Sequence, residues 1–317
     1  MDLSVVIPIF NEVESLPPLA EKLSSALRDL RKSYEVIFVD DGSTDGSDKA
    51  LRRICGADPN LRFISLSRNF GQTAAISAGI DSAKGDILVL MDGDLQNDPA
   101  DIGLLLNGVA EGFDVVSGWR KDRKDPFLTR RLPSIVANAL LSRLTGLRLH
   151  DFGCTLKAYR REVLEGVRLY GEMHRFIPVY AHWQGGRVTE VVVTHHRRQQ
   201  GRSKYGLERI GKVVLDVIVM TFLGHHLVKP IYTFGFAGFL FLALSALIVT
   251  AMIVLKLFFG VYMIQTPLPV LAAMMFITGI INLLLGIIAE INIRTYFESQ
   301  GKKTYSLRTR VNSEDRA

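Results

Sequence analysis

The segment DILVLMDGD, residues 86–94, decides the fold of this chain. Residues 86–91 form a short, mostly apolar run, and the acidic residues Asp92 and Asp94 follow that run directly. A continuous apolar run of this length that ends in polar residues is typical of a buried strand in a parallel sheet. We therefore expect a strand over residues 86–91, with both carboxylates at its carboxyl end.

Strands and helices alternate along the chain on both sides of this segment. Further apolar runs typical of strands occupy residues 3–10, 34–39, 61–66 and 114–118. Patterns typical of helices occupy residues 14–30, 43–54 and 72–83. The alternation predicts an α/β domain in which a mainly parallel sheet carries helices on both faces. Such sheets bind ligands at the carboxyl ends of their strands, where Asp40 and Asp92 both fall.

A divalent cation is the ligand that Asp92 and Asp94 suit best. Two carboxylates separated by one small residue can face the same hard cation, and Mg²⁺ or Mn²⁺ binds carboxylates together with phosphate oxygens of a substrate. Ordinary surface turns also contain Asp-x-Asp, so the pattern alone is not specific. The preceding strand and the companion motifs described below favour a metal site that holds a diphosphate.

The last third of the chain lacks charged residues over two long stretches. No Asp, Glu, Lys or Arg occurs in residues 231–255 or 257–289. Because about 20 apolar residues cross a bilayer as a helix, we predict transmembrane helices at about 231–256 and 267–290. The predicted division of the chain is a globular domain over 1–208, an amphipathic juxtamembrane helix over 209–228, two spans within 229–292 and a tail over 293–317.

Basic residues indicate the orientation in the membrane. Lys229 precedes the first span and Arg294 follows the second, whereas residues 260–266 between the spans carry no charge. Segments rich in Lys and Arg stay in the cytoplasm, and the amino terminus lacks the features of a signal peptide. We therefore expect an inner or plasma membrane protein whose globular domain and two chain ends are cytoplasmic. In that reducing compartment Cys55 and Cys154 are expected to be free thiols.

Membrane lipid or phosphate, and not nucleic acid, is the partner that the basic residues indicate. The formal net charge is +6, and many basic residues gather at 120–131 and 197–212 without a recognised nucleic-acid motif. Residues 132–145 and 210–222 are predicted to be amphipathic helices at the membrane surface, with core helices of the globular domain as the alternative. His174 and the other histidines show no metal-binding spacing, and we interpret them as surface or interfacial residues.

Three motifs together resemble glycosyltransferase family 2. They are Val5-Val6-Ile7-Pro8-Ile9-Phe10-Asn11-Glu12, Val39-Asp40-Asp41-Gly42-Ser43-Thr44-Asp45 and Asp92-Gly93-Asp94. Further matches over residues 68–72, 94–99 and 201–205, with the two spans, resemble the polyisoprenyl-phosphate glycosyltransferase branch. That branch includes dolichyl-phosphate mannose synthase, and within it the bacterial bactoprenol glucosyltransferases are the most similar. The resemblance implies a GT-A fold with a Rossmann-like sheet.

The resemblance also implies a donor site at the strand ends. The positions that it assigns to the nucleotide sugar are Pro8, Asn11, Glu12, Asp40, Asp92 and Lys204. The positions that it assigns to the metal are Asp92, Asp94 and Gln96. Asp41 has two interpretations, a role in the site or a structural role, because Asp-Gly-Ser-Thr-Asp also forms a turn and a helix cap.

An acceptor site is implied by the same resemblance. It assigns Arg120 to substrate phosphate, and it places the lipid phosphate near Arg130, Arg131 and Ser134. Asp151 matches an acidic position beside the acceptor. It acts either as a general base or by orienting a substrate, because a phosphate acceptor is already anionic at neutral pH. Arg202 and Lys204 would stabilise the leaving nucleotide, with binding of anionic lipid headgroups as the alternative.

The implied reaction is the inverting transfer of a hexose to a polyisoprenyl phosphate at the cytoplasmic membrane face. We expect UDP-glucose as donor, undecaprenyl phosphate as acceptor and Mg²⁺ or Mn²⁺ as cofactor, while mannose, galactose and aminoarabinose donors stay open. A non-catalytic membrane protein that binds sugar nucleotides is the alternative from another class. A processive polysaccharide synthase is disfavoured because the chain lacks a Gln-x-x-Arg-Trp motif. A homo-oligomer that packs through small residues of the spans also stays open, with Gly235, Gly238, Gly279 and Gly286 as candidates.

Overall fold

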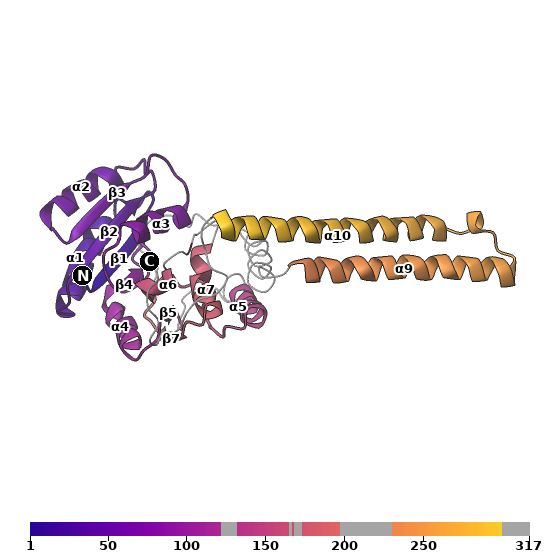
Figure 1. The fold of residues 1–317 in the computed structure, drawn as a ribbon. Coiled ribbons are helices and arrows are strands. Elements are labelled where there is room, and N and C mark those ends of the chain that lie inside the picture. The colour runs from indigo at the N-terminus through magenta and orange to yellow at the C-terminus, as the bar shows by residue number, and fades with distance from the viewer. Residues whose placement is uncertain (122–131, 165–166, 168–172, 197–229, 300–317) are drawn as a thin grey trace. The chain divides into compact units, whose positions relative to one another are not determined.

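The computed structural model describes residues 1–121, 132–164, 167, 173–196 and 230–299 (Figure 1). The chain divides into two compact units, Met1–Val219 and Met220–Ala317. The described part of the first unit contains a sheet with its helices, and that of the second contains two long apolar helices.

The sheet of the first unit has seven strands among the described residues, in the order β3-β2-β1-β4-β6-β5-β7. Neighbouring strands are parallel except at β6, which runs antiparallel to β4 and β5. The strands are β1 (Leu3–Ile9), β2 (Tyr34–Asp40), β3 (Leu61–Ser65), β4 (Ile87–Leu90), β5 (Val115–Trp119), β6 (Lys157–Arg160) and β7 (Val188–Val192). The predicted mainly parallel α/β sheet is confirmed, and β6 and β7 are additions that the sequence analysis does not predict.

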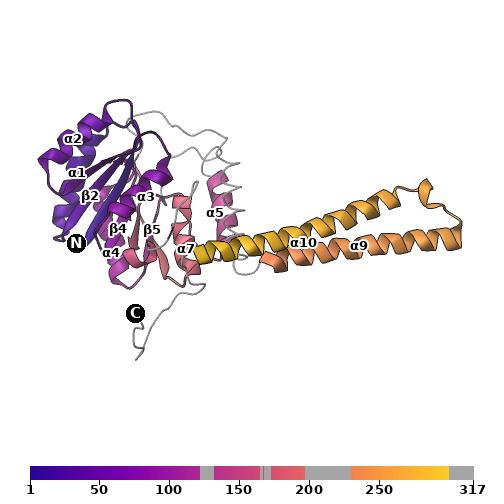
Figure 2. The same cartoon turned by 45° about the horizontal axis from the view of Figure 1, so that its top comes forward.

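Helices cover both faces of the sheet, as Figure 2 shows. Side chains that alternate along each strand point to opposite faces, so Val5 and Ile7 join one apolar cluster and Val6 joins the other. The first cluster includes residues of α1 (Leu16–Asp29), α2 (Ser47–Ala57) and α4 (Ile102–Ala110). The second includes residues of α3 (Gln72–Ser82), α6 (Arg161–Leu164) and α7 (Ile177–Trp183). The first unit also contains η1 (Pro99–Asp101), α5 (Leu132–Thr145) and η3 (Met173–Phe176).

The carboxyl ends of β1, β2 and β4 meet at one edge of the sheet. Ile9 at the end of β1 pairs with Asp40 at the end of β2, and Met91 directly after β4 donates its backbone N–H to the carbonyl of Val6. Gly93 packs closely there, because a Cβ at this position would lie 2.3 Å from Cδ1 of Ile9 and would displace the end of that side chain. The packing therefore favours a small residue between Asp92 and Asp94.

The second unit consists of α9 (Pro230–Phe259) and α10 (Leu268–Ser299), with the short η4 (Met263–Gln265) between them. Two segments, Ile231–Phe259 and Leu268–Asn292, are long and apolar enough to cross a membrane. Only 17% of the most apolar window of each is buried, whereas a core helix of a soluble protein would be mostly buried. The exposed apolar surface suits a lipid environment.

Close packing of α9 against α10 uses glycine at two facing positions. A Cβ at Gly238 would lie 3.0 Å from the carbonyl oxygen of Gly279, and a Cβ at Gly279 would lie equally close to that of Gly238. Nearby, the Ser245 hydroxyl donates to the carbonyl of Ala272 at 2.8 Å. Small residues let helix backbones approach in this way. Gly238 and Gly279 therefore allow the close packing of α9 against α10 within one chain.

Replacing Gly279 with Leu is expected to destabilise the helix pair by about 1–3 kcal/mol, because the larger side chain overpacks the contact with α9. Thermal unfolding of the full-length protein in detergent measures the effect as a lower melting temperature. Gly235→Leu is the matched control, since a Cβ at Gly235 meets no heavy atom within 4 Å. Equal loss of stability in both variants would contradict the described packing.

Candidate functional site

Two loops at the carboxyl edge of the sheet are tied together by Asn11. The backbone N–H of Asn11 donates to Ser43 Oγ at 2.9 Å, and the Asn11 side-chain oxygen accepts from the N–H of Thr44 at 2.8 Å. Asn11 adopts φ of 53°, a left-handed conformation that Asn tolerates better than most residues. The next residue, Glu12, donates its N–H to Ser47 Oγ at 3.2 Å. Asn11 and Glu12 therefore form one surface with the loop after β2.

Asp40 and Asp41 are both buried but differ in what they bind. Asp40 Oδ1 accepts from the N–H of Ser43 at 3.1 Å. The two oxygens of Asp41 accept from the N–H groups of Phe70 and Gly71, at 2.8 and 2.9 Å. Asp41 therefore anchors the loop between β3 and α3, which supports the structural interpretation of this residue.

Asp92 is held at the sheet edge by polar partners. Gln72, the first residue of α3, donates its Nε2 to Asp92 Oδ1 at 2.7 Å, and Thr155 also hydrogen bonds to this carboxylate. Burial raises the pKa of the Asp92 carboxyl, against the opposing effects of the Thr155 bond and of the charges of Arg120 and Arg175. A divalent cation bound to the carboxylate would offset this cost of burial.

The turn that follows carries the other predicted metal ligands. Asp94 Oδ1 accepts from the N–H of Gln96 at 3.1 Å, and Leu95 between them has a φ of 60°. Carboxylate and amide oxygens are the ligands that Mg²⁺ and Mn²⁺ prefer. Within the described residues no group of three or more His, Cys, Asp or Glu side chains could hold a metal. A cation here would therefore need further oxygens, from Gln96 and from a bound diphosphate.

His195 and His196, which follow β7, contact the segment that carries the predicted metal ligands. His195 forms a β-bridge with Asn97, and the N–H of His196 donates to the carbonyl of Gln96 at 2.9 Å. The His196 ring also contacts Asp98, with Nε2 2.9 Å from Oδ2. These contacts fix the backbone beside the predicted metal ligands.

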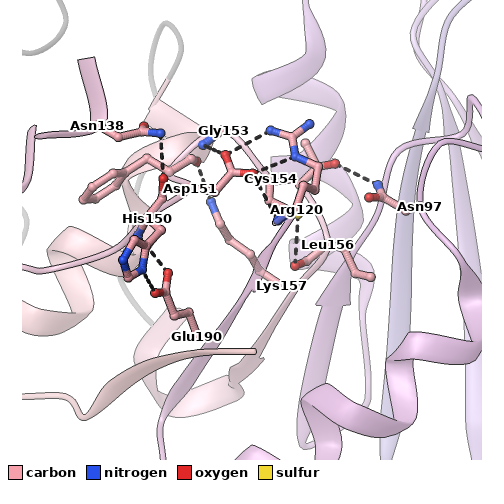
Figure 3. Close-up of polar contacts among 12 residues, drawn as sticks. Asn97, Arg120, Asn138, His150, Asp151, Gly153, Cys154, Leu156, Lys157 and Glu190 are labelled. Atoms are coloured by element: carbon pink, nitrogen blue, oxygen red, sulfur yellow. Dashed lines mark hydrogen bonds and ion pairs between the residues drawn. The ribbon is translucent and has the colours of Figure 1, made fainter. Parts of the chain in front are cut away.

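Arg120 and Asp151 form a two-bond ion pair in the same region (Figure 3). The guanidinium donates from Nε to Asp151 Oδ2 at 2.7 Å and from Nη2 to Oδ1 at 3.0 Å. Burial opposes the charge on Arg120, but the hydrogen bonds and charge of Asp151 outweigh it and raise the Arg120 pKa. Since Arg120 occupies both oxygens of Asp151, the carboxylate orients the guanidinium in this arrangement.

Lys157 and His174 are buried residues near the site, and the sequence analysis assigns neither of them to it. Lys157, on β6 (Figure 3), lies beside the Arg120–Asp151 pair. Its Nζ donates to the carbonyl oxygens of Phe152 and Arg175, at 3.0 and 3.4 Å. His174, in η3, has Nδ1 2.7 Å from Thr73 Oγ1. His174 is only 4% exposed, so the interpretation of this histidine as a surface or interfacial residue is wrong. It is buried because η3 packs against the start of α3.

Several predicted site residues lie outside the described part of the chain. These are Arg130, Arg131, Arg202 and Lys204. Ser134 lies in the first turn of α5 and is half-buried. Cys55 and Cys154 are free thiols, as predicted. Burial raises the pKa of each to about 11, so neither is a reactive thiolate at neutral pH.

Comparison with known proteins identifies relatives along nearly the whole chain. The sequence profile described as Glycosyl transferase family 2 matches residues 4–168. A dodecaprenyl-phosphate galacturonate synthase of Rhizobium johnstonii is 40% identical over 315 residues, which cover 97% of this chain and 92% of that protein. An undecaprenyl-phosphate 4-deoxy-4-formamido-L-arabinose transferase of Pseudomonas fluorescens is 36% identical, over 96% of this chain and 88% of that protein.

A solved structure shares the fold of the first unit. Glucosyl-3-phosphoglycerate synthase from Mycobacterium tuberculosis, in complex with Mn²⁺, UDP and phosphoglyceric acid, aligns with a TM-score of 0.54 over 70% of this chain and 77% of that chain. Its sequence is 21% identical. The match shows that the fold is GT-A, as predicted.

Lys157 is expected to make the stability of the first unit depend on pH. Burial lowers the Lys157 pKa from its ordinary value of 10.5 to about 8. Between these two values the unfolded chain carries a proton that the folded chain lacks, so the free energy of unfolding rises with pH across this window, by about 3 kcal/mol at most. Lys157→Met should lack this rise.

Urea unfolding followed by tryptophan fluorescence at pH 7 and pH 10 measures the difference. Both tryptophans, Trp119 and Trp183, lie in the first unit. Lys84→Met is the matched control because Lys84 is exposed, and it should keep the pH response of the wild type. An unchanged response in Lys157→Met would contradict the assigned burial cost.

Proposed function

Because the chain belongs to glycosyltransferase family 2, we propose that it transfers a sugar from a nucleotide sugar to a polyprenyl phosphate, with inversion at the anomeric carbon. One observation carries this proposal. Asp40, Asp92, Asp94 and the Arg120–Asp151 pair all lie at the carboxyl edge of the sheet in a GT-A fold. The names of both relatives support the acceptor class, since each name includes a polyprenyl phosphate.

The donor half of the site would bind the nucleotide between the first two loops. Asn11, Glu12 and Asp40 offer oxygens that accept hydrogen bonds from a base and a ribose. Asp92, Asp94 and Gln96 would hold Mg²⁺ or Mn²⁺. When bound, the cation neutralises the diphosphate and so makes the nucleoside diphosphate a better leaving group.

The acceptor half would use Arg120, which Asp151 holds in one orientation. Its Nη1 has no partner among the described residues, so it can donate to a phosphate oxygen. The lipid phosphate attacks the anomeric carbon as the bond to the diphosphate breaks, and a phosphate monoester with a second pKa near 6 needs no strong base. The engagement of Asp151 by Arg120 supports an orienting role and not proton removal.

Membrane attachment would bring the site to its lipid substrate. We propose that α9 and α10 cross the inner membrane, with the catalytic domain and both chain ends in the cytoplasm. The exposed apolar surface of the two helices supports the crossing, and the basic residues that flank them support the orientation. Interfacial helices over 132–145 and 209–228 remain part of this proposal, as does the assignment of Arg130 or Arg131, with Ser134, to the acceptor phosphate.

The sequence analysis expects glucose as the transferred sugar, and the relatives point to other sugars. UDP-glucose has no support from the two named relatives, whose sugars are galacturonate and 4-deoxy-4-formamido-L-arabinose. We therefore propose a nucleotide-linked sugar as the donor class and include UDP-glucose only as one member of a panel. The non-catalytic alternative becomes one outcome of the same assay.

Asp94→Ala is expected to lower transfer by at least about 100-fold, because it removes a ligand of the cation that stabilises the leaving group. The assay uses full-length protein in detergent, undecaprenyl phosphate, Mn²⁺ and a panel of labelled sugar nucleotides. Asp81→Ala is the matched control, since Asp81 is exposed near the end of α3. Wild-type activity of Asp94→Ala in a chelator would refute the metal site, and retained nucleotide binding without any transfer would favour the non-catalytic alternative.

A further inference from the structure

Two consecutive residue pairs join the end of β5 to the segment before β6. The first pair is Trp119 and His150, whose rings stack with centroids 4.2 Å apart and 14° between the ring planes. The second pair is Arg120 and Asp151, the residues that directly follow them in the sequence. The stack therefore lies next to the ion pair that the proposed function assigns to the acceptor phosphate.

Glu190, on β7, contacts both the backbone and the ring of His150 (Figure 3). Its Oε2 accepts from the His150 N–H at 2.8 Å, and its Oε1 is paired with Nδ1 of the ring. Because a carboxylate only accepts hydrogen bonds, Nδ1 carries the hydrogen in this contact. Glu190 thereby fixes the rotamer that places the His150 ring on Trp119.

Helix α5 contacts the same segment through two polar side chains. Asn138 Nδ2 donates to the carbonyl of His150 at 2.8 Å (Figure 3). The Ser142 hydroxyl donates to the carbonyl of Leu149 at 3.2 Å. The His150 carbonyl belongs to the planar peptide group that links His150 to Asp151. Its bond to Asn138 therefore fixes the backbone directly before Asp151.

The Arg120–Asp151 pair depends on this backbone because its geometry is narrow. A planar guanidinium and a planar carboxylate form two parallel bonds only when their planes align. The bonds from Nε and Nη2 of Arg120 are 2.7 and 3.0 Å long, and the N–H of Gly153 donates to Asp151 Oδ1 at 3.1 Å. A shift of the backbone before Asp151 would lengthen these bonds and turn Nη1 of Arg120 away from its present direction.

His150 itself lies at the surface, unlike the ion pair beside it. Its side chain is 65% exposed, whereas those of Arg120 and Asp151 are 15% and 4% exposed. Removal of an exposed ring leaves no buried cavity and changes stability little. The loss would be confined to the stack on Trp119 and the ring contact with Glu190, and both act on the backbone beside Asp151.

We propose that His150 is a positioning residue of the acceptor site. Held by Trp119 and Glu190, it fixes the backbone of Asp151, and Asp151 in turn aims Nη1 of Arg120 at the phosphate of the lipid. The inference rests on the proposed function and adds a residue that acts through the ion pair. Direct contact of the exposed ring with a substrate is the alternative, and the experiment separates the two.

Steady-state kinetics of full-length His150→Ala in detergent test the proposal. The substrates are undecaprenyl phosphate and the sugar nucleotide of the panel that the wild type uses best, with Mn²⁺. We expect kcat/KM for the lipid to fall about 10-fold or more and KM for the sugar nucleotide to stay within about two-fold, because only the group that faces the acceptor is misplaced.

His182→Ala is the matched control, since His182 is an exposed histidine of α7, and it should keep the kinetics of the wild type. Wild-type kcat/KM for the lipid in His150→Ala, or an equal weakening for both substrates, would overturn the proposal while leaving the proposed function intact. Absence of transfer by the wild type from every donor would refute the proposed function, and this inference with it.

A double-mutant cycle separates positioning from direct contact. Asp151→Asn alone should lower kcat/KM for the lipid by about 10- to 100-fold. Adding His150→Ala to it should cost less than about two-fold more, because His150 acts through Asp151. Losses that multiply would overturn the proposal in favour of direct substrate contact or of a general structural role.

Conservative variants test each contact of the ring. His150→Phe keeps the stack and the backbone N–H, so its kcat/KM for the lipid should lie within about three-fold of the wild type. A loss as large as that of His150→Ala would overturn the role of the stack. Glu190→Gln accepts only one of the two bonds and should lower kcat/KM for the lipid several-fold. Glu190→Gln decides the matter if His150→Ala does not fold, and wild-type kinetics in this variant would then overturn the proposal.

Discussion

The carboxylate of Asp92 lies at the carboxyl edge of a buried sheet, and the surrounding elements hold it there. Gln72 at the start of α3 and Thr155 before β6 both hydrogen bond to it, and the neighbouring Gly93 packs against the end of the Ile9 side chain. Burial opposes the charge of this carboxylate, so the position is most stable when a cation is present. The family's transfer of a sugar from a diphosphate supplies a reason for a cation at that place.

Most of the fold follows from the apolar runs in the sequence. The runs that become β1, β2, β4 and β5 are mostly buried, and helical patterns separate the strands from β1 to β4, so the order and parallel direction of those strands could be predicted. The strand β6 could not, because Lys157–Arg160 contains Lys and Arg, and the sequence analysis also missed β7, although Val and Thr dominate Val188–Val192. Their strand character comes from pairing with β4 and β5. Tertiary contacts, and not local propensity, place β6 in the sheet.

The site was predictable where its residues follow strands and not where distant segments meet. The sequence position of Asp40, Asp92 and Asp94 allowed their prediction as site residues, since each lies at or just beyond a strand end. The pairing of Arg120 with Asp151 depends on the register of β5 and β6, which the sequence does not reveal. Lys157 is harder still, because a lysine in a short polar strand is normally a surface residue. The anchoring role of Asp41 likewise becomes visible only once the loop before α3 is in place.

The central claim is that the Asp92–Gln96 turn holds the cation and diphosphate of the donor. A crystal structure of the full-length protein with Mn²⁺ and a sugar nucleotide, with the manganese located by anomalous scattering, tests it most directly. The account predicts manganese about 2 Å from a carboxylate oxygen of Asp92 or Asp94 and from a diphosphate oxygen of the nucleotide. Manganese or the diphosphate bound away from this turn would contradict it.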